Sequence, residues 1–285
     1  MANLKDIKRR IGSVKNTQQI TKAMKLVAAA KLRRAQESVI ASRPFSDKVA
    51  EVMEGLAQRA NKEAHPLLRR REVKKVLVIV MAGDKGLCGP FNSNILKMAL
   101  KVIGENAGKE ISLILVGKKG VDFFRRRKMN IVQVYLDYGK KLGYDLAGSI
   151  AAQAMERFAD ESVDQVYMIY NKFRNVVVQE ARTVSLLPVT APKVDEHATQ
   201  VDYEYEPSAD AVLGEVIKRY VESQVFQSLL ESAASENGAR MTAMDAATKN
   251  AKDMIGSLTL SYNRARQAAI TKEIIEVVSG ADAIS

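Results

Sequence analysis

The segment MTAMDAATKNAKDMIGSLTLSYNRARQAA, residues 241–269, places small or apolar side chains three and four positions apart. It belongs to a longer run, residues 208–285, that contains no proline. This spacing puts the apolar side chains on one stripe of an α-helix, as in a coiled coil, and Thr248 interrupts the stripe. The members of the stripe are Met241, Met244, Ala251, Ile255, Leu258, Tyr262, Ala265 and Ala269.

The N-terminal segment, residues 3–57, repeats the pattern, with Pro44 as its one interruption. Continuous helices of these lengths would be about 80 Å and about 110 Å long, whereas a small domain is about 30 Å across. Both helices must therefore leave the globular body, and we expect them to pair as an antiparallel coiled coil. The N-terminal stripe includes Leu4, Ile7, Ile11, Val14, Ala28, Leu32, Ala35 and Val39.

The register of this pair follows from where the helices leave the body. If they leave side by side near Ala57 and Ser208, antiparallel partners have residue numbers that add to about 265. Ile11 should then lie near Ile255, and residues 264–285 should project without a helix partner. That tip carries apolar side chains that a lone helix would expose: Ile270, Ile274, Ile275, Val277 and Val278.

Between the helices, short apolar runs rich in β-branched residues alternate with helical patterns. This alternation predicts an α/β body with a Rossmann-like, mostly parallel sheet covered on both faces. The last two strands are separated only by residues 171–175, which predicts an antiparallel hairpin at the sheet edge. We expect strands at residues 75–81, 111–116, 131–135, 163–170 and 176–186, and helices at 92–103, 119–127 and 150–158.

The resulting domain prediction has three segments. Residues 1–57 form the N-terminal shaft helix, residues 58–207 form the α/β body, and residues 208–285 form the C-terminal shaft helix. Pro188 and Pro192 begin a polar connector that ends at Pro207.

Composition narrows the class of protein. The chain of 285 residues carries a formal net charge of +11, of which residues 1–43 contribute +9, from eleven basic and two acidic side chains. A basic helix suggests nucleic acid, but this one has no aromatic residue before Phe45, so an acidic protein surface fits equally. No apolar run is long enough to span a membrane, and the N-terminus lacks a secretory signal, so we expect the cytosol.

The sequence offers little catalytic chemistry. The turn GDKGLCG, residues 83–89, follows the first strand where a phosphate-binding loop would lie, but it matches neither the dinucleotide fingerprint nor the P-loop. We interpret it as a tight strand-to-helix turn. Cys88 is the single cysteine, and His65 and His197 both lie in polar connectors, so neither a metal site, a cofactor site nor a catalytic pair is expected.

Three segments carry a resemblance to a known family. Residues 5–33, with NTQQITKAM and VAAAKLR, and residues 236–274, with ENGARMTAMDAATKNA and YNRARQAAITKEI, resemble the terminal helices of the gamma subunit of F-type ATP synthase. The turn at residues 83–89 is similar to the family's G-D-R-G-L-C-G signature, with Lys85 in place of Arg. Pro90 also departs from the family, which often has a further Gly there. The resemblance covers the whole chain.

The resemblance implies a non-catalytic central-stalk rotor of a bacterial enzyme. Its helix pair would turn inside a ring of alpha and beta subunits, with its body bound to epsilon and to the c-subunit ring in the membrane. It would couple proton transport to ATP synthesis or hydrolysis as a peripheral protein on the cytoplasmic face of the inner membrane. No nucleic acid, cofactor or metal is implied.

The resemblance also implies contact residues. Met24 would face an acidic loop of beta, and Arg266 and Gln267 would engage another beta loop in one rotary position. Tyr205 and Glu206 match positions near the membrane ring or epsilon. Two alternatives remain open at this point: an α/β enzyme with helical arms, and a basic coiled-coil scaffold for nucleic acid.

Overall fold

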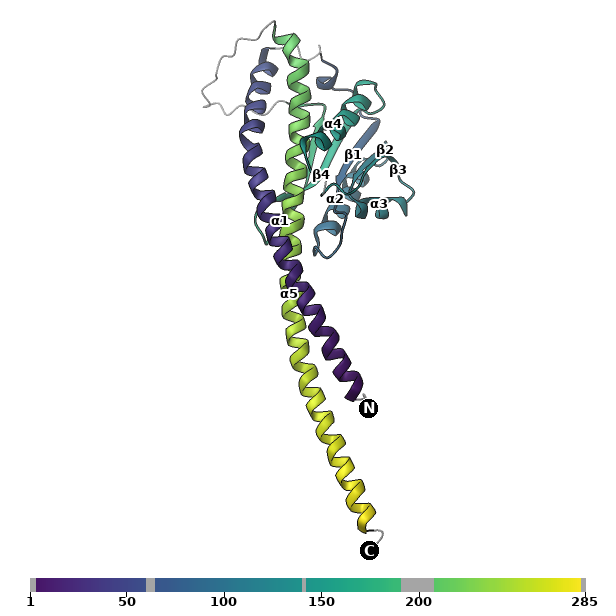
Figure 1. The fold of residues 1–285 in the computed structure, drawn as a ribbon. Helices are drawn as coiled ribbons and strands as arrows, with labels where there is room; N and C mark the ends of the chain where they lie inside the picture. Colours follow the sequence, from purple (N-terminus) through teal and green to yellow (C-terminus); the bar gives the residue numbers. More distant parts are fainter. Residues whose placement is uncertain (1–3, 60–64, 140–141, 191–207, 283–285) are drawn as a thin grey trace. The chain divides into compact units, whose positions relative to one another are not determined.

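The computed structural model describes residues 4–59, 65–139, 142–190 and 208–282. Two long helices, α1 (Leu4–Arg59) and α5 (Ala209–Asp282), begin and end this part of the chain, as predicted (Figure 1). The chain divides into two compact units. The shaft unit comprises Met1–Val27 and Met241–Ser285, and the body unit comprises Ala28–Arg240. This division cuts both long helices, whereas the predicted segments 1–57, 58–207 and 208–285 keep them whole, so those boundaries stay a prediction.

In the shaft unit, α1 and α5 run antiparallel. The hydroxyl oxygens of Thr21 and Thr248 lie 2.8 Å apart, and Lys25 Nζ lies 2.6 Å from Asp245 Oδ1. The paired numbers add to 269 and 270, so the predicted sum of about 265 is wrong by about one helical turn. The polar pair at Thr248 also explains the break in the apolar stripe. Around it, Ile7, Met244 and Ala251 are buried.

The predicted register was wrong because it was set from the assumed exit points of the two helices, near Ala57 and Ser208, and not from side-chain contacts between them. In the body unit, Ser46 and Ser223 form a buried hydrogen bond of 2.9 Å, and their numbers also add to 269. At this register Ile11 lies opposite Leu258 instead of Ile255, and both side chains are half-buried. Helix α1 continues through Pro44, although a proline nitrogen cannot bond the carbonyl four residues earlier. Buried Val39 and Ser46 pack on either side of that missing bond.

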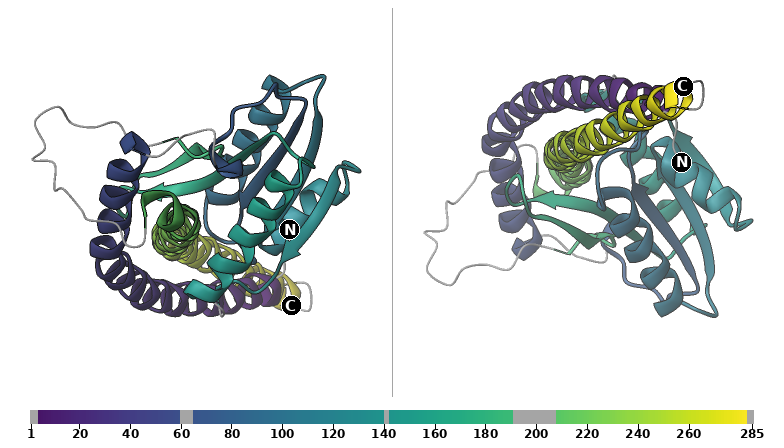
Figure 2. Two further views of the ribbon diagram at one scale, coloured as in Figure 1. Left: turned by 90° about the horizontal axis from the view of Figure 1, so that it is seen from above. Right: turned by 90° about the horizontal axis from the view of Figure 1, so that it is seen from below.

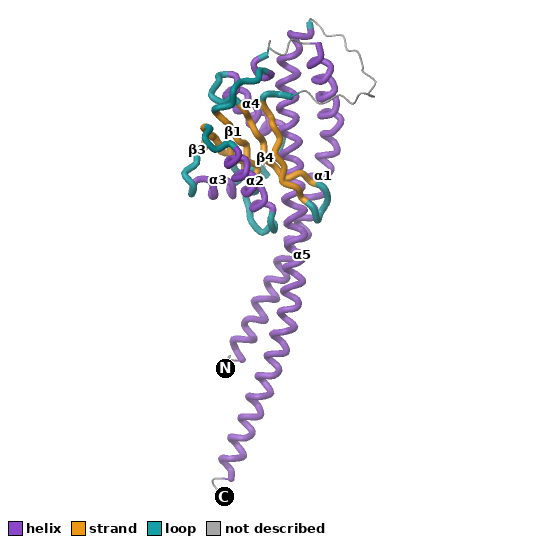
Figure 3. The backbone as a smooth tube through the Cα atoms, turned by 180° about the vertical axis from the view of Figure 1, so that it is seen from behind, coloured by secondary structure: helices purple, strands orange, loops and turns teal. Residues whose placement is uncertain are grey.

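The body unit is a five-stranded sheet in the order β3-β2-β1-β4-β5. The pairs β1–β2, β2–β3 and β1–β4 are parallel and β4–β5 is antiparallel, so the predicted mixed sheet is confirmed. Figure 3 shows the strands of this sheet in orange. The remaining elements, in chain order, are η1 (Pro66–Leu68), β1 (Lys75–Met81), α2 (Phe91–Glu105), β2 (Glu110–Val116), α3 (Lys118–Arg125), β3 (Asn130–Tyr135), α4 (Tyr144–Ala159), β4 (Gln165–Phe173) and β5 (Gln179–Leu187).

Helices cover both faces of the sheet, because successive strand side chains point to opposite faces. Val76, Val78 and Val80 of β1 pack under α2 and α3. Leu77, Ile79 and Met81 pack under α4 and α5 in a second core cluster. In this unit α5 lies between the sheet and α1 (Figure 2). Met53 and Leu56 of α1 complete the second cluster, so both long helices contribute to the core of the body.

The β4–β5 hairpin turns three residues later than predicted. Asn175 Oδ1 accepts hydrogen bonds from the amides of Val177 and Val178, at 2.9 Å and 2.8 Å. Such a side-chain turn substitutes for a backbone turn. It lets β4 continue through Phe173, so the predicted loop at 171–175 and the strand start at 176 are wrong.

Candidate functional site

Met24 lies on the shaft unit's α1 next to the polar pairs that join the two helices. Its side chain is half-buried, and the next residue, Lys25, is the one paired with Asp245. Three apolar neighbours of Met24 remain exposed: Ile20, Leu26 and Val27. Scattered exposed apolar residues are ordinary, but three within eight positions of one helix, beside the half-buried Met24, form a surface suited to a partner. Met24 is thus both a packing residue of the pair and the edge of an uncovered apolar surface.

Arg266 and Gln267 are exposed on α5 of the same unit. They begin the unpaired end of the helix, where the last half-buried side chain is Ala269. Beyond it every side chain up to residue 279 is exposed, so the predicted tip of residues 264–285 is confirmed over residues 270–279, whereas Ala265 and Ala269 are half-buried. Its apolar residues keep 48–71% of their surface in contact with solvent: Ile270, Ile274, Ile275, Val277 and Val278.

The structure does not bring the two sets of predicted contact residues together. Asp245 lies beside Lys25, and Arg266 follows 21 residues later on the same helix, which is about 30 Å along the axis. Met24 and Arg266 must therefore meet a partner at different levels. Tyr205 and Glu206 lie outside the described residues.

Hydrogen bonds join the turn at Gly83–Gly89 to the first turn of α2, the start of α3 and the β3–α4 loop. Gly83 donates its amide proton to Asn92 Oδ1 at 2.8 Å. Asp84 Oδ1 accepts hydrogen bonds from the amides of Lys118 and Asp137, both at 3.1 Å. A β-carbon at position 83 would come within 3.2 Å of both the Asn92 and Glu236 side chains. Helix α5 lies against the turn, since Arg240 also donates to the Gly86 carbonyl at 3.3 Å, and these contacts support a structural turn.

Cys88 does not have the surroundings of a nucleophile. Its side chain is buried with Phe91 and Ala239, and burial raises the pKa of the thiol. Asn92 Nδ2, which cannot act as a base, lies 3.2 Å from Sγ, and the nearby Glu236 carboxylate raises the pKa of the thiol further, although Arg240 opposes this. No group of three or more metal-ligating side chains occurs among the described residues. This geometry does not favour the enzyme alternative.

Several basic side chains have local partners. Arg71 donates to the Phe158 carbonyl at 2.6 Å and lies over the Phe158 ring, and Arg127 lies over the Phe123 ring. On α1, Arg9 pairs with Asp6 and Arg33 with Glu37. Part of the positive charge is therefore bound within the chain. In the part of the chain that the structure describes, no helix is long and apolar enough to cross a membrane.

Sequence reasoning missed a polar network between α5 and the body. Glu236 pairs with Arg240 at 2.6 Å and accepts a 2.8 Å hydrogen bond from the hydroxyl of Tyr138. The spacing of Glu236 and Arg240, four residues apart on a helix, could have predicted the ion pair. The sequence did not show that the pair is buried or that Tyr138 of the β3–α4 loop contacts Glu236.

Comparison with known proteins gives consistent matches. The family model described as ATP synthase matches residues 3–284. The ATP synthase gamma chain of Geobacter sp. (strain M21) is 51% identical over 286 residues, covering 100% of this chain and 99% of the relative. That of Pelotomaculum thermopropionicum is 51% identical over 284 residues, covering 100% of both.

Solved structures match as well. A chain in the central stalk and c ring of the Tetrahymena thermophila mitochondrial ATP synthase is 27% identical, with a TM-score of 0.59 over 80% of this chain and 99% of that one. A chain of the Euglena gracilis mitochondrial ATP synthase gives a TM-score of 0.70 over 99% of this chain and 94% of that one, at 18% identity, and shares the fold. On these matches, the chain belongs to the ATP synthase gamma-chain family.

Proposed function

We propose that this chain turns as the central rotor of a bacterial F-type ATP synthase and couples a membrane c ring to a catalytic ring of alpha and beta subunits. As a gamma chain it is a non-catalytic subunit of the central stalk. The observation that carries the proposal is the antiparallel pair of α1 and α5, whose tip extends as a single helix with its apolar residues exposed. A lone helix in water gains about 1.5–3 kcal/mol for each such side chain that a partner buries fully.

The proposed contact residues fall into three groups, each with its own partner. Met24 and its apolar neighbours would meet an acidic loop of beta, and Lys22 supplies complementary charge. Arg266 and Gln267 would stand at the mouth of an apolar sleeve that the ring forms around the tip. Tyr205 and Glu206, together with the body, would contact epsilon and the c ring, which places the chain peripherally on the cytoplasmic face of the inner membrane.

A rotation assay tests the proposal. The ring of this organism's own alpha and beta subunits is fixed to a surface, and a bead is attached to the body through Arg126→Cys in a Cys88→Ala background. Added ATP should drive the bead in one direction. Hydrolysis by the assembled complex with a stationary bead contradicts the rotor role.

The membrane contact has its own test. Replacing Tyr205 and Glu206 by alanine should release the catalytic part from membranes more readily while its ATP hydrolysis stays intact. Unchanged attachment assigns that contact to other residues.

A further inference from the structure

In the body unit, hydrogen bonds that involve specific side chains join α5 to neighbouring loops. The Tyr138 hydroxyl donates to Glu236 Oε2 at 2.8 Å, and Arg240 Nη2 donates to the Gly86 carbonyl at 3.3 Å. Within α5, Arg240 and Glu236 form an ion pair of 2.6 Å. The three side chains therefore link α5 to the loops that follow β1 and β3.

This network is shielded from water. The Glu236 and Arg240 side chains are 13% and 14% exposed, and Tyr138 is buried. Burial, and next the Glu236 carboxylate, raise the pKa of the Tyr138 phenol well above its ordinary value, so it remains a donor. A buried ion pair adds little stability compared with apolar packing of the same volume, but it holds one geometry because its hydrogen bonds are directional.

Two further contacts fix α5 at other points along its axis. The Tyr144 hydroxyl on α4 donates to Glu222 Oε2 at 3.1 Å, and Ser235 Oγ donates to the Asn171 carbonyl at 3.0 Å. From Glu222 to Arg240 these contacts span about 27 Å of helix. Close-packed apolar side chains of α5 already oppose its turning, because turning would expose its buried face, and directional hydrogen bonds add a sharper angular preference. Directional bonds at several levels oppose rotation of α5 about its own axis.

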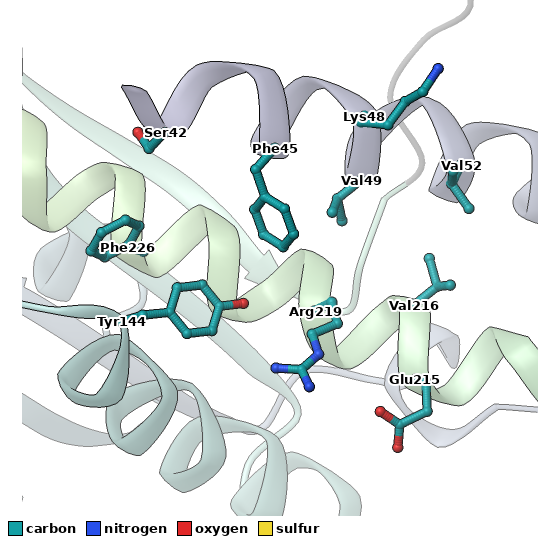
Figure 4. Close-up of a pocket in the computed structure, with 10 residues that line it drawn as sticks. All are labelled: Ser42, Phe45, Lys48, Val49, Val52, Tyr144, Glu215, Val216, Arg219 and Phe226. Atoms are coloured by element: carbon teal, nitrogen blue, oxygen red, sulfur yellow. The ribbon is translucent and has the colours of Figure 1, made fainter. Parts of the chain in front are cut away.

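Helix α1 is held differently in the same unit. A cavity of about 700 Å³ separates part of α1 from α4 and α5 (Figure 4). Its α1 wall is Phe45, Val49 and Val52, and these side chains face Tyr144 and Val216 across it (Figure 4). Across this cavity the edge of Phe45 lies on the Tyr144 ring, with centroids 6.2 Å apart, and beside it Ser46 and Ser223 form the neutral hydroxyl pair described above. Because charge-assisted bonds, which are stronger than a neutral hydroxyl pair or a ring edge, hold α5 to the loops of the body, α1 is the freer of the two helices to shift.

We propose that torque passes between the body and the shaft through α5, and that Glu236, Arg240 and Tyr138 are the positioning residues that lock its rotation, with α1 carried along by α5. This inference rests on the proposed rotor function. It predicts that the lock sets the torsional stiffness of the rotor more than its stability.

The decisive variant replaces the buried pair by apolar residues of similar volume, Glu236→Leu with Arg240→Met. The bead assay described above measures the angular variance of the body while the ring holds a fixed nucleotide state. We expect the variance to rise about twofold, because two of the four inter-element contacts named above are removed and charge-assisted bonds are the stronger ones. The thermal unfolding midpoint of the complex should fall only slightly: apolar replacement of a buried pair is neutral or stabilising, whereas the buried Tyr138 hydroxyl loses its acceptor at a cost of about 1–3 kcal/mol.

The matched control is Ser46→Ala, which removes the α1–α5 hydrogen bond and leaves the body contacts intact. Its angular variance should equal that of the unmodified chain. The proposal is overturned if the double variant has unchanged variance, or if Ser46→Ala softens the rotor equally. Should the double variant fail to assemble, Tyr138→Phe decides, because it removes only a hydroxyl: it should soften the rotor, and an unchanged variance overturns the proposal. A wild-type bead that never turns with ATP refutes the rotor function instead.

Discussion

Covalently linking the two shaft helices should leave the machine running. Thr21→Cys and Thr248→Cys, in a Cys88→Ala background, place two thiols where hydroxyl oxygens now lie 2.8 Å apart. A disulfide needs sulfur atoms about 2.05 Å apart, so closure asks for a shift of less than about 1 Å. Oxidation should therefore form the bond readily without disturbing the pair.

The expected effect on stability is large. The two positions are 227 residues apart in sequence, so the bond closes a loop of nearly the whole chain. Loop-closure entropy lost from the unfolded chain then stabilises the fold by about 5 kcal/mol. In urea, the oxidised chain should unfold at a clearly higher midpoint than the same chain after reduction.

Turnover of the assembled complex distinguishes sliding of α1 against α5 from rotation of the helix pair against the surrounding ring. ATP hydrolysis and proton pumping by the assembled complex are measured before oxidation, after it, and after reduction. The 21–248 bond should leave both rates unchanged, because α1 and α5 turn as one body. A cysteine at Gln267 linked to a cysteine of the surrounding ring should stop both rates, and reduction should restore them.

Two results refute this reasoning. If the 21–248 bond stops turnover, the two helices must slide against each other during the cycle. If the Gln267 link forms and hydrolysis continues unchanged, rotation of the shaft against the ring at that level is not needed.

Three further predictions concern substitutions of single residues. Met24→Lys adds a charge beside Lys22 and Lys25 and should form an ion pair with the acidic loop of beta; assembly should persist while proton pumping per ATP falls, and an unaltered ratio contradicts the contact. Glu231 is buried, and burial raises the pKa of its carboxyl, so ionisation disfavours the fold as pH rises through the ordinary value of 4.5. Glu231→Gln should accordingly raise the thermal midpoint at about pH 8 and leave it unchanged at about pH 4; a lower midpoint at about pH 8 shows that the nearby cations outweigh burial. Gly117 has φ of 90°, and a β-carbon there would collide with the Ala82 carbonyl oxygen. Gly117→Ala should cost about 1–3 kcal/mol in urea unfolding, whereas Gly108→Ala shares the positive φ without the collision and should cost less.

The sequence alone determined the main elements of this protein. The apolar stripe from Met241 to Ala269 and the absence of proline required a long helix, and the β-branched run at 75–81 required a buried strand. Both are local patterns: apolar residues three and four apart indicate a helix buried on one face, and a continuous apolar run indicates a strand buried on both faces. The exposed tip followed because α5, with 74 described residues, is longer than its partner α1, with 56.

Tertiary structure decided the register, the hairpin turn and the contact of α5 with the β3–α4 loop. Sliding a helix pair by one turn keeps the stripe facing its partner, so the pattern could not distinguish a sum of 265 from one near 269. The Thr21–Thr248 and Ser46–Ser223 contacts select the register because buried hydroxyls need partners at one offset. The joint of Tyr138 with Glu236 links residues 98 apart. Nothing near either residue in the chain specifies that contact, because it exists only after the sheet has brought the β3–α4 loop against α5.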